Sequence, residues 1–283
     1  MNVNENDQNM KVAIVILNYQ NSRDSLACVR SISKQNYHEL AGVLVVDNGS
    51  SEDNFKILKD SLGERKEVFS LIRLRKNLGF ARGNNVGICY ARRKWNTDYI
   101  LIVNNDTLFT DPDMLSKLLA HRESDVAMIG PAIRLKNGYI QKEYTSITRF
   151  PFLAYRYLSF WAESLYCNSL CERMQTKWNQ KELQQRVLHG CALLFTPVFF
   201  KYYLGIYSKT FLYSEEEILW FQLQKVGLKQ CYVPETEIFH LEDQSTNLSF
   251  KDVERGTLRY HRKSAWHAMI AKILPYNILK RMC

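Results

Sequence analysis

Apolar residues occur in short runs along this chain, and amphipathic segments lie between the runs. Four runs of apolar and β-favouring residues stand in the first part of the sequence, at 11–17, 43–46, 69–74 and 99–103. Short apolar runs closed by polar residues are typical of buried strands in parallel sheets. Between them, apolar residues recur at three- and four-residue steps, which predicts helices at 21–33, 55–62 and 83–95. This alternation predicts an α/β fold with a mainly parallel sheet flanked by helices.

Polar residues close each of the four apolar runs. The closing segments are Asn18-Tyr19, Asp47-Asn48-Gly49, 77–85 and Asn104-Asn105-Asp106. The carboxyl ends of parallel strands meet at one edge of a sheet, and ligands bind in the crevice beyond that edge. We therefore expect a polar ligand site there, with the Asp106 carboxylate delivered to it. The alternative is a set of well-capped turns, because Asn and Asp are also common turn residues.

The pattern changes after residue 131. Residues 133–141 are compatible with a hairpin around Asn137-Gly138, a favoured two-residue turn. The segment 150–178 is rich in aromatic residues without a clean period. Such a composition fits either an acceptor-binding surface or a helical pair packed on the sheet, and packing is the commoner outcome.

Strand character returns at 187–195, with His189-Gly190 inside the run. A glycine within a strand often marks the close approach of a ligand. Three consecutive acids follow at 215–217, at the start of a predicted helix that ends before Gly227. A last strand at 229–233 leads towards His240.

Composition narrows the class of protein. The 283 residues are 46% hydrophobic, enough for a large core in one domain or in one domain with a subdomain. The formal net charge is +9, from 38 Lys and Arg against 29 Asp and Glu, which favours nucleic acid, anionic lipid or phosphorylated ligands as partners. The seven cysteines are scattered, and the closest pair, Cys167 and Cys171, lacks further ligands at metal-site spacing. This usage indicates core thiols in a reducing compartment.

The sequence contains no evident targeting or membrane-spanning segment. Residues 1–10 are polar and lack the basic-then-apolar layout of a signal peptide, so we expect this segment to be poorly ordered. The most apolar stretch, 187–207, is interrupted by His189, Pro197 and Lys201, which argues against a membrane span. We expect a cytoplasmic protein.

Seven segments, taken together, resemble the nucleotide-sugar-dependent glycosyltransferases of family 2. They read VAIVILNYQN, VVDNGSSED, RKNLGFARGNN, ILIVNNDT, HGCALLF, FLYSEEEILWFQLQKVGLK and EIFHLEDQST. They occur in the family's order and extend over 11–246. The resemblance implies the GT-A fold, a Rossmann-like α/β sheet flanked by helices. The branch that looks most similar contains rhamnosyltransferase-like enzymes of bacterial cell-surface polysaccharide assembly.

The resemblance implies a donor site at the strand ends. Asn18 and Tyr19 match residues that touch the nucleotide, and Asp47 matches an acid that accepts a hydrogen bond from a uracil or thymine ring. Asn48 and Gly49 shape the adjacent turn. The loop and helix start along the ribose and diphosphate correspond to Asn77, Gly79, Arg82, Gly83 and Asn85. Glycines allow close backbone approach, a helix N-terminus favours anions, and an arginine can pair with phosphate. Asn104, Asn105, His189 and Gly190 complete the expected donor site.

A divalent metal site is implied at Asn104-Asn105-Asp106, which matches the family's Asp-x-Asp motif. The first acid is replaced by Asn104, so that Asp106 is the remaining carboxylate ligand. His240 matches a late histidine that completes the metal site in several family members, and its alternative is a structural histidine at a strand end. Carboxylate and diphosphate oxygens suit hard cations, and an imidazole ligand favours Mn²⁺ over Mg²⁺ without deciding between them.

The acids at 215–217 match the family's motif for the catalytic base. The reaction requires an acceptor hydroxyl to lose its proton while it attacks the anomeric carbon from the face opposite the leaving diphosphate, which inverts that centre. A carboxylate within hydrogen-bond reach supplies this function. Glu216 occupies the matching position, with Glu215 and Glu217 as alternatives. Acids left over would be favoured at a helix start by the helix dipole.

Basic and apolar residues alternate at the end of the chain. From Lys251 onward eight Lys or Arg face only two acids, and Trp266, Met269, Ile270, Ile273 and Leu274 step by three and four. Such a helix lies on anionic membranes or docks on the domain with a solvated basic face. We expect three regions: a poorly ordered segment 1–10, a GT-A domain 11–249 with a nucleotide-binding half 11–130 and an acceptor and catalytic half 131–249, and a basic helical segment 250–283.

The resemblance thus implies an inverting, metal-dependent transferase. It would move a hexosyl or rhamnosyl unit from a UDP- or dTDP-sugar to an acceptor hydroxyl in cell-surface polysaccharide synthesis. The acceptor would be a saccharide or a lipid-linked saccharide. An anionic membrane surface is a further partner, which would place the protein on the inner face of the membrane. A nucleotidyltransferase is an alternative, although it would carry a Gly-rich basic loop where this chain has Asn18-Tyr19-Gln20-Asn21. A degenerate nucleotide-sugar binder is another. A nucleic-acid partner is not expected, since the basic residues of a nucleic-acid-binding protein should form a stripe with aromatics on one module, whereas here acids occupy two separate strand ends.

Overall fold

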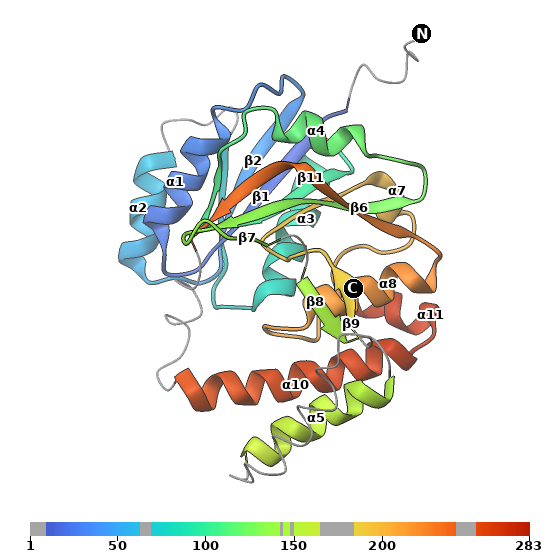
Figure 1. The fold of residues 1–283 in the computed structure, drawn as a ribbon. Coiled ribbons are helices and arrows are strands. Elements are labelled where there is room, and N and C mark those ends of the chain that lie inside the picture. Colours follow the sequence, from blue (N-terminus) through green and yellow to red (C-terminus); the bar gives the residue numbers. More distant parts are fainter. Residues whose placement is uncertain (1–9, 63–68, 142–143, 148–149, 165–183, 242–252) are drawn as a thin grey trace.

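The computed structural model describes residues 10–62, 69–141, 144–147, 150–164, 184–241 and 253–283. Four parallel strands form one half of its main sheet, in the order β3-β2-β1-β4 (Figure 1). Their bounds are Val12–Asn18 for β1, Leu40–Asp47 for β2, Phe69–Arg73 for β3 and Tyr99–Asn104 for β4. The four apolar runs of the sequence are therefore strands, as predicted, and their carboxyl ends meet at one edge.

Helices cover both faces of this half. The connecting helices are α1 (Ser22–Ile32), α2 (Glu52–Leu62) and α3 (Phe80–Trp95). Alternate residues of the strands pack on opposite layers, because successive side chains of a strand point to opposite faces. In β1, Ile14 and Ile16 belong to the core that includes α1 and α2, whereas Ala13 and Val15 belong to the core that includes α3. Strands β1, β2 and β4 are consequently buried on both faces, as their continuous apolar runs predict, whereas the edge strand β3 is only partly buried.

The second half of the sheet is mixed. Strand β10 (Ala192–Phe195) runs antiparallel between β4 and β6 (Val126–Leu135), and β11 (Lys229–His240) runs parallel to β6. The edge strand β5 (Thr107–Phe109) is antiparallel to β11. The expected hairpin forms between β6 and β7 (Ile140–Gln141), and Gly138 has a φ of +80° in its turn. Strand β11 is longer than predicted, with an irregular register between Val233 and Glu237.

The prediction of one strand over 187–195 is wrong. The segment is divided between β9 (Gln184–Val187), which pairs with β8 (Tyr144–Ile147), and β10. His189 and Gly190 lie between the two strands. The backbone N–H of Gly190 donates to Glu216 Oε1 at 3.2 Å, and that of Cys191 donates to His189 Nδ1 at 3.1 Å. These side-chain acceptors engage the backbone donors that a continuous sheet ladder would require.

The aromatic segment forms a helix, α5 (Phe150–Ser164), but it packs on another helix and not on the sheet. Its partner is α10 (Val253–Ile273), and the two lie side by side below the sheet (Figure 1). A separate apolar cluster joins α5 and α10 to α8 (Glu215–Lys225), with Leu153, Ile218 and Met269 among its members. Helix α8 lies between this pair and the main core. The rest of the predicted aromatic segment, 165–178, lies outside the described residues.

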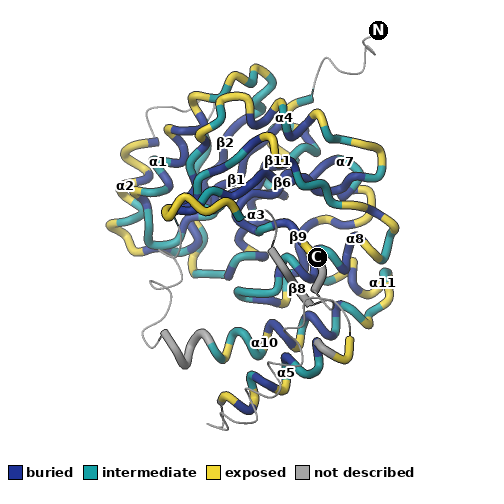
Figure 2. Tube along the Cα trace, in the orientation of Figure 1, coloured by how far each residue is buried: buried dark blue, intermediate teal, exposed yellow. Residues whose placement is uncertain are grey.

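Helix α10 is docked on the domain, and its apolar residues do not form the single face that the sequence suggested. Met269 is buried together with Ala265, Ala268 and Ala271, whereas Trp266 and Ile273 are 46% and 64% exposed. Figure 2 shows buried and exposed stretches alternating along both α10 and α5. Small alanine side chains allow the helix to lie close to its neighbours, which leaves the larger residues of the other side outside the core.

In the described ranges, the remaining short helices are α4 (Met114–Ala120), α7 (Pro197–Phe200) and α11 (Tyr276–Leu279), the last followed by a 3₁₀ turn at Lys280–Met282. Within the described part of the chain, no helix combines the length and apolarity needed to cross a bilayer. The division into regions at residues 130 and 249 stays a prediction. Residues 1–9 of the N-terminal segment lie outside the described part.

Candidate active site

A cavity of about 140 Å³ opens at the carboxyl edge of the parallel strands. Its walls come from the ends of β1, β2 and β4, from the start of α3 and from a loop before α8. The lining residues are Leu17, Tyr19, Asn48, Asn77, Gly79, Phe80, Asn104, Asn105, Phe211 and Leu212. Six of the residues expected to bind the donor therefore line one cavity, as the parallel topology requires.

Side-chain amides hold the strand ends of this cavity together. Asn18 Nδ2 donates to Asp47 Oδ1 at 2.9 Å, and Asn105 Nδ2 donates to Asn18 Oδ1 at 3.4 Å. Asn48 Nδ2 donates to Asn77 Oδ1 at 3.0 Å, while its own oxygen accepts the backbone N–H of Leu78 at 2.9 Å. Buried amides of this kind fix the geometry when their partners are satisfied.

Asp47 lies beneath the cavity and does not line it. Its side chain is fully buried, and Oδ2 accepts the backbone N–H of Ser50 at 3.3 Å and lies 3.7 Å from Arg73 Nε. The carboxylate thus fixes the turn after β2. Its predicted contact with a pyrimidine ring stays a prediction.

Two glycines permit the close approach of loops at the cavity. Gly79 has φ 82° and ψ −179°, a region that only glycine adopts readily, and a Cβ there would overlap the backbone oxygen of Phe211. Gly49 has φ +78°, and its Cβ would overlap the backbone of Lys76. Gly83 serves helix packing, since a Cβ there would meet the Leu17 side chain at 2.6 Å.

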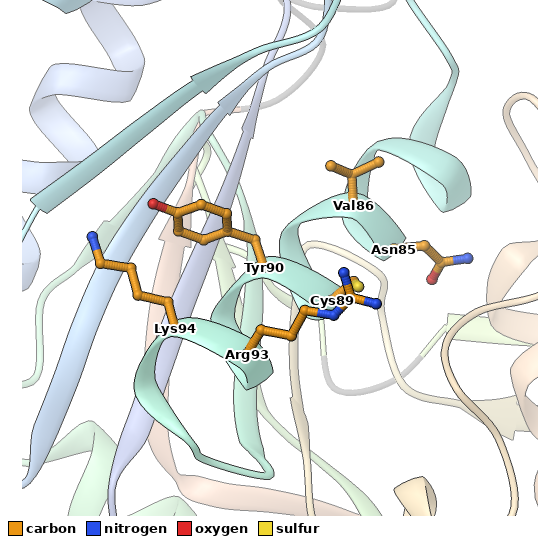
Figure 3. Close-up of a pocket in the computed structure, with 6 residues that line it drawn as sticks. All are labelled: Asn85, Val86, Cys89, Tyr90, Arg93 and Lys94. Atoms are coloured by element: carbon orange, nitrogen blue, oxygen red, sulfur yellow. The ribbon is translucent and has the colours of Figure 1, made fainter.

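Arg82 and Asn85 do not line the cavity. Arg82 Nε donates to the backbone oxygen of Ser208 at 2.7 Å, and Asn85 both donates to and accepts from the backbone of Ile206. The two side chains fasten α3 to the segment 206–208. A larger hollow of about 630 Å³ lies beside Asn85, but all six of its lining side chains project from α3 (Figure 3). It contains no carboxylate and is remote from the strand ends, so it is not the candidate active site.

Asp106 faces His240 at the end of β4. The short strand β5 begins immediately after Asp106, and it pairs with the end of β11 so that Thr107 is opposite His240. This pairing places His240 Nε2 3.3 Å from Asp106 Oδ1, with both residues buried. Asp106 Oδ1 accepts no hydrogen bond from any described residue. A buried carboxylate oxygen without a donor is costly unless a ligand or cation satisfies it.

His189 stands next to this pair. Its ring centroid is 5.6 Å from that of His240. Burial lowers the pKa of His189 to about 4, and the nearby His240 acts in the same direction. His189 is therefore a neutral ring at physiological pH. Asn104 N donates to the backbone oxygen of Cys191 at 2.9 Å, which ties the turn around His189 and Gly190 to the end of β4.

The three glutamates at the start of α8 have three different surroundings. Glu217 is buried and makes a bidentate ion pair with buried Arg156 of α5. Glu215 is buried, and this burial raises the pKa of its carboxyl well above the usual range. Glu216 alone of the three retains partial exposure, and its Oε1 accepts the backbone N–H of Gly190 at 3.2 Å. Burial raises the pKa of Glu216 as well.

The structure thus connects Glu216, through the turn at His189 and Gly190, to His240 and Asp106. These groups come from α8, the β9–β10 turn, β11 and the end of β4. The arrangement brings one partly accessible carboxylate, two imidazoles and one unsatisfied carboxylate oxygen to the edge that also carries the amide-lined cavity. A proton acceptor and a cation-binding position are the functions that such groups can perform.

The loop before α8 contains site residues that the sequence did not indicate. Phe211 and Leu212 line the cavity, and Phe80 on α3 joins them. Tyr213 and Ser214 both have left-handed backbone angles, with φ of +75° and +64°. Non-glycine residues in this region cost conformational energy and are concentrated at functional sites. The segment FLYSEEEILWFQLQKVGLK includes this loop, but the sequence gave no sign of its left-handed backbone because neither residue is a glycine.

A family model described as "Glycosyltransferase like family 2" matches residues 9–258 of the chain. The chain belongs to glycosyltransferase family 2. The matched range contains the residues of the cavity, the Asp106–His240 pair and the glutamates of α8. The nucleotidyltransferase alternative finds no support in this match.

Individual relatives are distant. A low-salt glycan biosynthesis hexosyltransferase, Agl10 of Haloferax volcanii, is 27% identical over 130 residues, which are 45% of this chain and 38% of that protein. The match thus spans well under half of the relative's length.

Solved structures share the fold at low sequence identity. The mannosyltransferase PcManGT from Pyrobaculum calidifontis, in complex with GDP-Man and Mn²⁺, has a TM-score of 0.56 and 12% identity, over 94% of this chain and 74% of that one. GalNAc-T7 with UDP, GalNAc and Mn²⁺ has a TM-score of 0.60 and 10% identity, over 83% and 44%. TarS of S. aureus in complex with UDP has a TM-score of 0.54 and 12% identity, over 83% and 61%. The family 2 chain therefore has the GT-A fold, as the sequence predicted.

Proposed function

We propose that this family 2 glycosyltransferase moves a hexosyl or rhamnosyl unit from a UDP- or dTDP-sugar to a saccharide hydroxyl, with inversion at the anomeric carbon. The observation that carries the proposal is the juxtaposition of Asp106, His240 and Glu216 beside the amide-lined cavity. A non-catalytic binder would need neither the partly exposed Glu216 carboxylate nor the buried Asp106 Oδ1 that lacks a hydrogen-bond donor among the described residues. A lipid-linked saccharide in cell-surface polysaccharide synthesis is the acceptor class that we propose.

Asp106 and His240 fit a divalent cation. Asp106 Oδ1 is buried, lacks a hydrogen-bond donor among the described residues and faces an imidazole nitrogen at 3.3 Å. No cluster of three or more His, Cys, Asp or Glu that suits a metal occurs in the described ranges, so these two side chains would share the ion with diphosphate oxygens. When bound, Mn²⁺ or Mg²⁺ neutralises charge on the leaving diphosphate. Asp106 and His240 would hold the ion at the end of β4.

Glu216 is the proposed general base. The backbone N–H of Gly190 orients one carboxylate oxygen, which leaves the other oxygen to accept the proton of the acceptor hydroxyl. Burial raises the pKa of this carboxyl towards the working range of a base. Glu217 is engaged with Arg156, and Glu215 is enclosed, so neither has the same freedom to meet an acceptor.

The proposed nucleotide position is the cavity at the strand ends. Tyr19 and Phe80 offer ring faces to a base or ribose, and Asn48, Asn77 and Asn104 offer amides. Asp47 supports this wall from below through Asn18. Since relatives of the same fold hold GDP-Man or UDP, the donor base is a point for direct measurement.

Thermal unfolding in the presence of UDP-, dTDP- and GDP-sugars, each with Mn²⁺, Mg²⁺ or EDTA, tests the proposal. A ligand that binds only the folded state at a hundred times its Kd stabilises by about 2.7 kcal/mol, which is an increase in Tm of about 4–5 °C for a chain of this size. We expect one donor class to give this increase, and EDTA to abolish most of it.

Asp106→Asn provides the matched test, with Asp60→Asn on the exposed side of α2 as control. Asp106→Asn should remove the metal-dependent part of the shift and the slow hydrolysis of the donor, and the control should retain both. No shift with any donor in the presence of metal would refute the proposed function. A shift and donor hydrolysis that persist unchanged in Asp106→Asn would refute the metal site.

A further inference from the structure

Helix α10 has a side that faces the protein and a side that does not. Ala265, Ala268 and Met269 are buried against the domain. On the opposite side, Arg259, Lys263, Trp266 and Ile273 recur at steps of four, three and seven residues, and all four are exposed. Residues at such spacing share one side of a helix. The side that faces away from the domain is therefore both apolar and basic.

Helix α5 continues this surface. Leu158 and Trp161, three residues apart, are 45% and 40% exposed. Two cross-helix contacts join their side of α5 to the exposed side of α10: Arg262 lies 4.0 Å over the Trp161 ring, and Trp266 lies 5.5 Å from the Tyr157 ring. The α5–α10 face thus consists of Leu158, Trp161, Arg259, Lys263, Trp266 and Ile273.

The described charged residues of this face, Arg259 and Lys263, are both cations. Residues 258–283 contain six Lys or Arg and no Asp or Glu. The acid of α5 closest to the face, Glu163, is two residues from Trp161 and so lies towards another side of the helix. Tryptophan places an apolar ring and a polar N–H at a membrane–water boundary, and Lys and Arg beside it bind anionic headgroups. Among the described residues, this face combines exposed tryptophans, exposed aliphatic residues and cations, and it therefore complements an anionic bilayer surface.

We propose that the α5–α10 face docks the protein on an anionic lipid surface. The described helices lie along the surface and do not insert through it, because none is suited to spanning a bilayer. The bilayer would receive Trp161, Trp266 and Ile273 at its headgroup level while Arg259 and Lys263 contact phosphates.

The protein-facing side of α10 contacts the loop of the candidate active site. The Tyr260 ring stacks on Phe211 at 4.7 Å, and the His261 ring stacks on Tyr213 at 3.8 Å. Ser264 Oγ donates to the backbone oxygen of Leu212 at 2.6 Å. One helix therefore joins the docking face to the loop that lines the cavity and leads into Glu216. Docking would present that loop to acceptors held in the same surface.

Co-sedimentation with vesicles tests the docking directly. Full-length protein is mixed with vesicles of phosphatidylcholine alone or of phosphatidylcholine and phosphatidylglycerol in equal parts, without donor or acceptor, so that the result does not depend on the proposed transfer activity. We expect binding to the anionic vesicles only, accompanied by a blue shift of tryptophan emission. One cation near an anionic membrane strengthens binding about five-fold, so Arg259→Glu/Lys263→Glu should weaken partitioning at least about 25-fold.

The matched control is α2, whose exposed Lys56, Ile57 and Lys59 resemble the face in composition. Lys56→Glu/Lys59→Glu and Ile57→Ser should bind as the unaltered protein does. Ile273→Ser, at a residue that is 64% exposed, should weaken vesicle binding without affecting Tm. Absence of vesicle binding, or binding that the Arg259→Glu/Lys263→Glu and Ile273→Ser variants retain, would overturn the proposal. Self-association lost in Ile273→Ser, without vesicle binding, would identify a protein interface instead.

Discussion

Glutamine substitution of the glutamates that open α8 separates catalysis from stability. In Glu216→Gln the side chain retains an oxygen that accepts the Gly190 N–H but cannot take up a proton. Removal of a general base lowers rate by about 10²- to 10⁴-fold, and we expect kcat to fall by that factor. Stability should change little, because burial already raises the pKa of this carboxyl and a neutral side chain is cheaper to bury.

Glu217→Gln should produce the opposite result. Arg156 is only 8% exposed, and the substitution removes the carboxylate that pairs with its guanidinium. Breaking a buried ion pair by removing one partner costs about 3–5 kcal/mol. With an unfolding entropy of about 2.1 cal/mol/K per residue, a chain of this length should lose about 5–8 °C in Tm. Turnover per folded molecule should remain measurable at low temperature.

A double variant tests whether the cost comes from the unpaired charge. Arg156→Met/Glu217→Leu removes both ions and fills the space with apolar atoms, so Tm should recover most of the loss seen in Glu217→Gln. Glu215→Gln should preserve both Tm and turnover, because burial raises the pKa of that carboxyl well above its usual range and a neutral side chain is cheaper to bury.

Circular-dichroism melting and single-turnover donor consumption measure the two properties on the same samples. The assignment of the base requires that Glu216→Gln lose turnover at unchanged Tm. If Glu216→Gln stayed active while Glu217→Gln lost turnover at unchanged Tm, the reasoning from burial and ion pairing would be refuted.

Three further substitutions are informative. Gly79→Ala should lower the free energy of unfolding by more than the roughly 1–3 kcal/mol of its backbone conformation alone, because the new Cβ also overlaps the backbone oxygen of Phe211. Gly138→Ala, whose Cβ meets open space, should cost only the backbone term, and urea unfolding of the two variants compares them. Gly190→Ala would place a Cβ 2.7 Å from Glu216 Oε1, so kcat should fall up to about 100-fold with Tm nearly unchanged, and an unchanged kcat would contradict this geometry. Burial and a neighbouring arginine lower the pKa of His261 from 6.5 to about 4, so the unfolded chain binds more protons in that window and stability should fall on acidification from pH 6.5 to 4. His261→Phe should remove up to about 2 kcal/mol of this loss at pH 5, measured by melting across pH, and an identical pH dependence in both proteins would exclude His261 as its source.

Some of the fold and site follows from short stretches of sequence. The apolar run at 11–17 became β1 at Val12–Asn18, and the run at 99–103 became β4 at Tyr99–Asn104. Such runs are readable because burial on both faces demands apolar side chains at every position. Parallel topology then brings the polar residues that close the runs to one edge, and Asn48, Asn77 and Asn104 line one cavity there.

Long-range contacts decided the rest. The resemblance favoured Glu216 as the base but left Glu215 and Glu217 open. Three identical side chains differ only in their neighbours, and here Arg156 binds Glu217 while Gly190 binds Glu216. The break between β9 and β10 could not be predicted either, because it depends on the contact of the Gly190 backbone with Glu216, which is distant in the sequence.

Helix α10 shows the same limit on a larger scale. Helical spacing grouped Met269 with Trp266 and Ile273, but the positions of α5 and α8 determined which of them became buried. The sequence by itself determined which segments form strands and helices and which polar residues close the strands, because those features depend on local patterns of burial. Only the tertiary structure decided which polar atoms are paired, which are left unsatisfied and which apolar side chains face solvent, because each depends on groups far away in the chain.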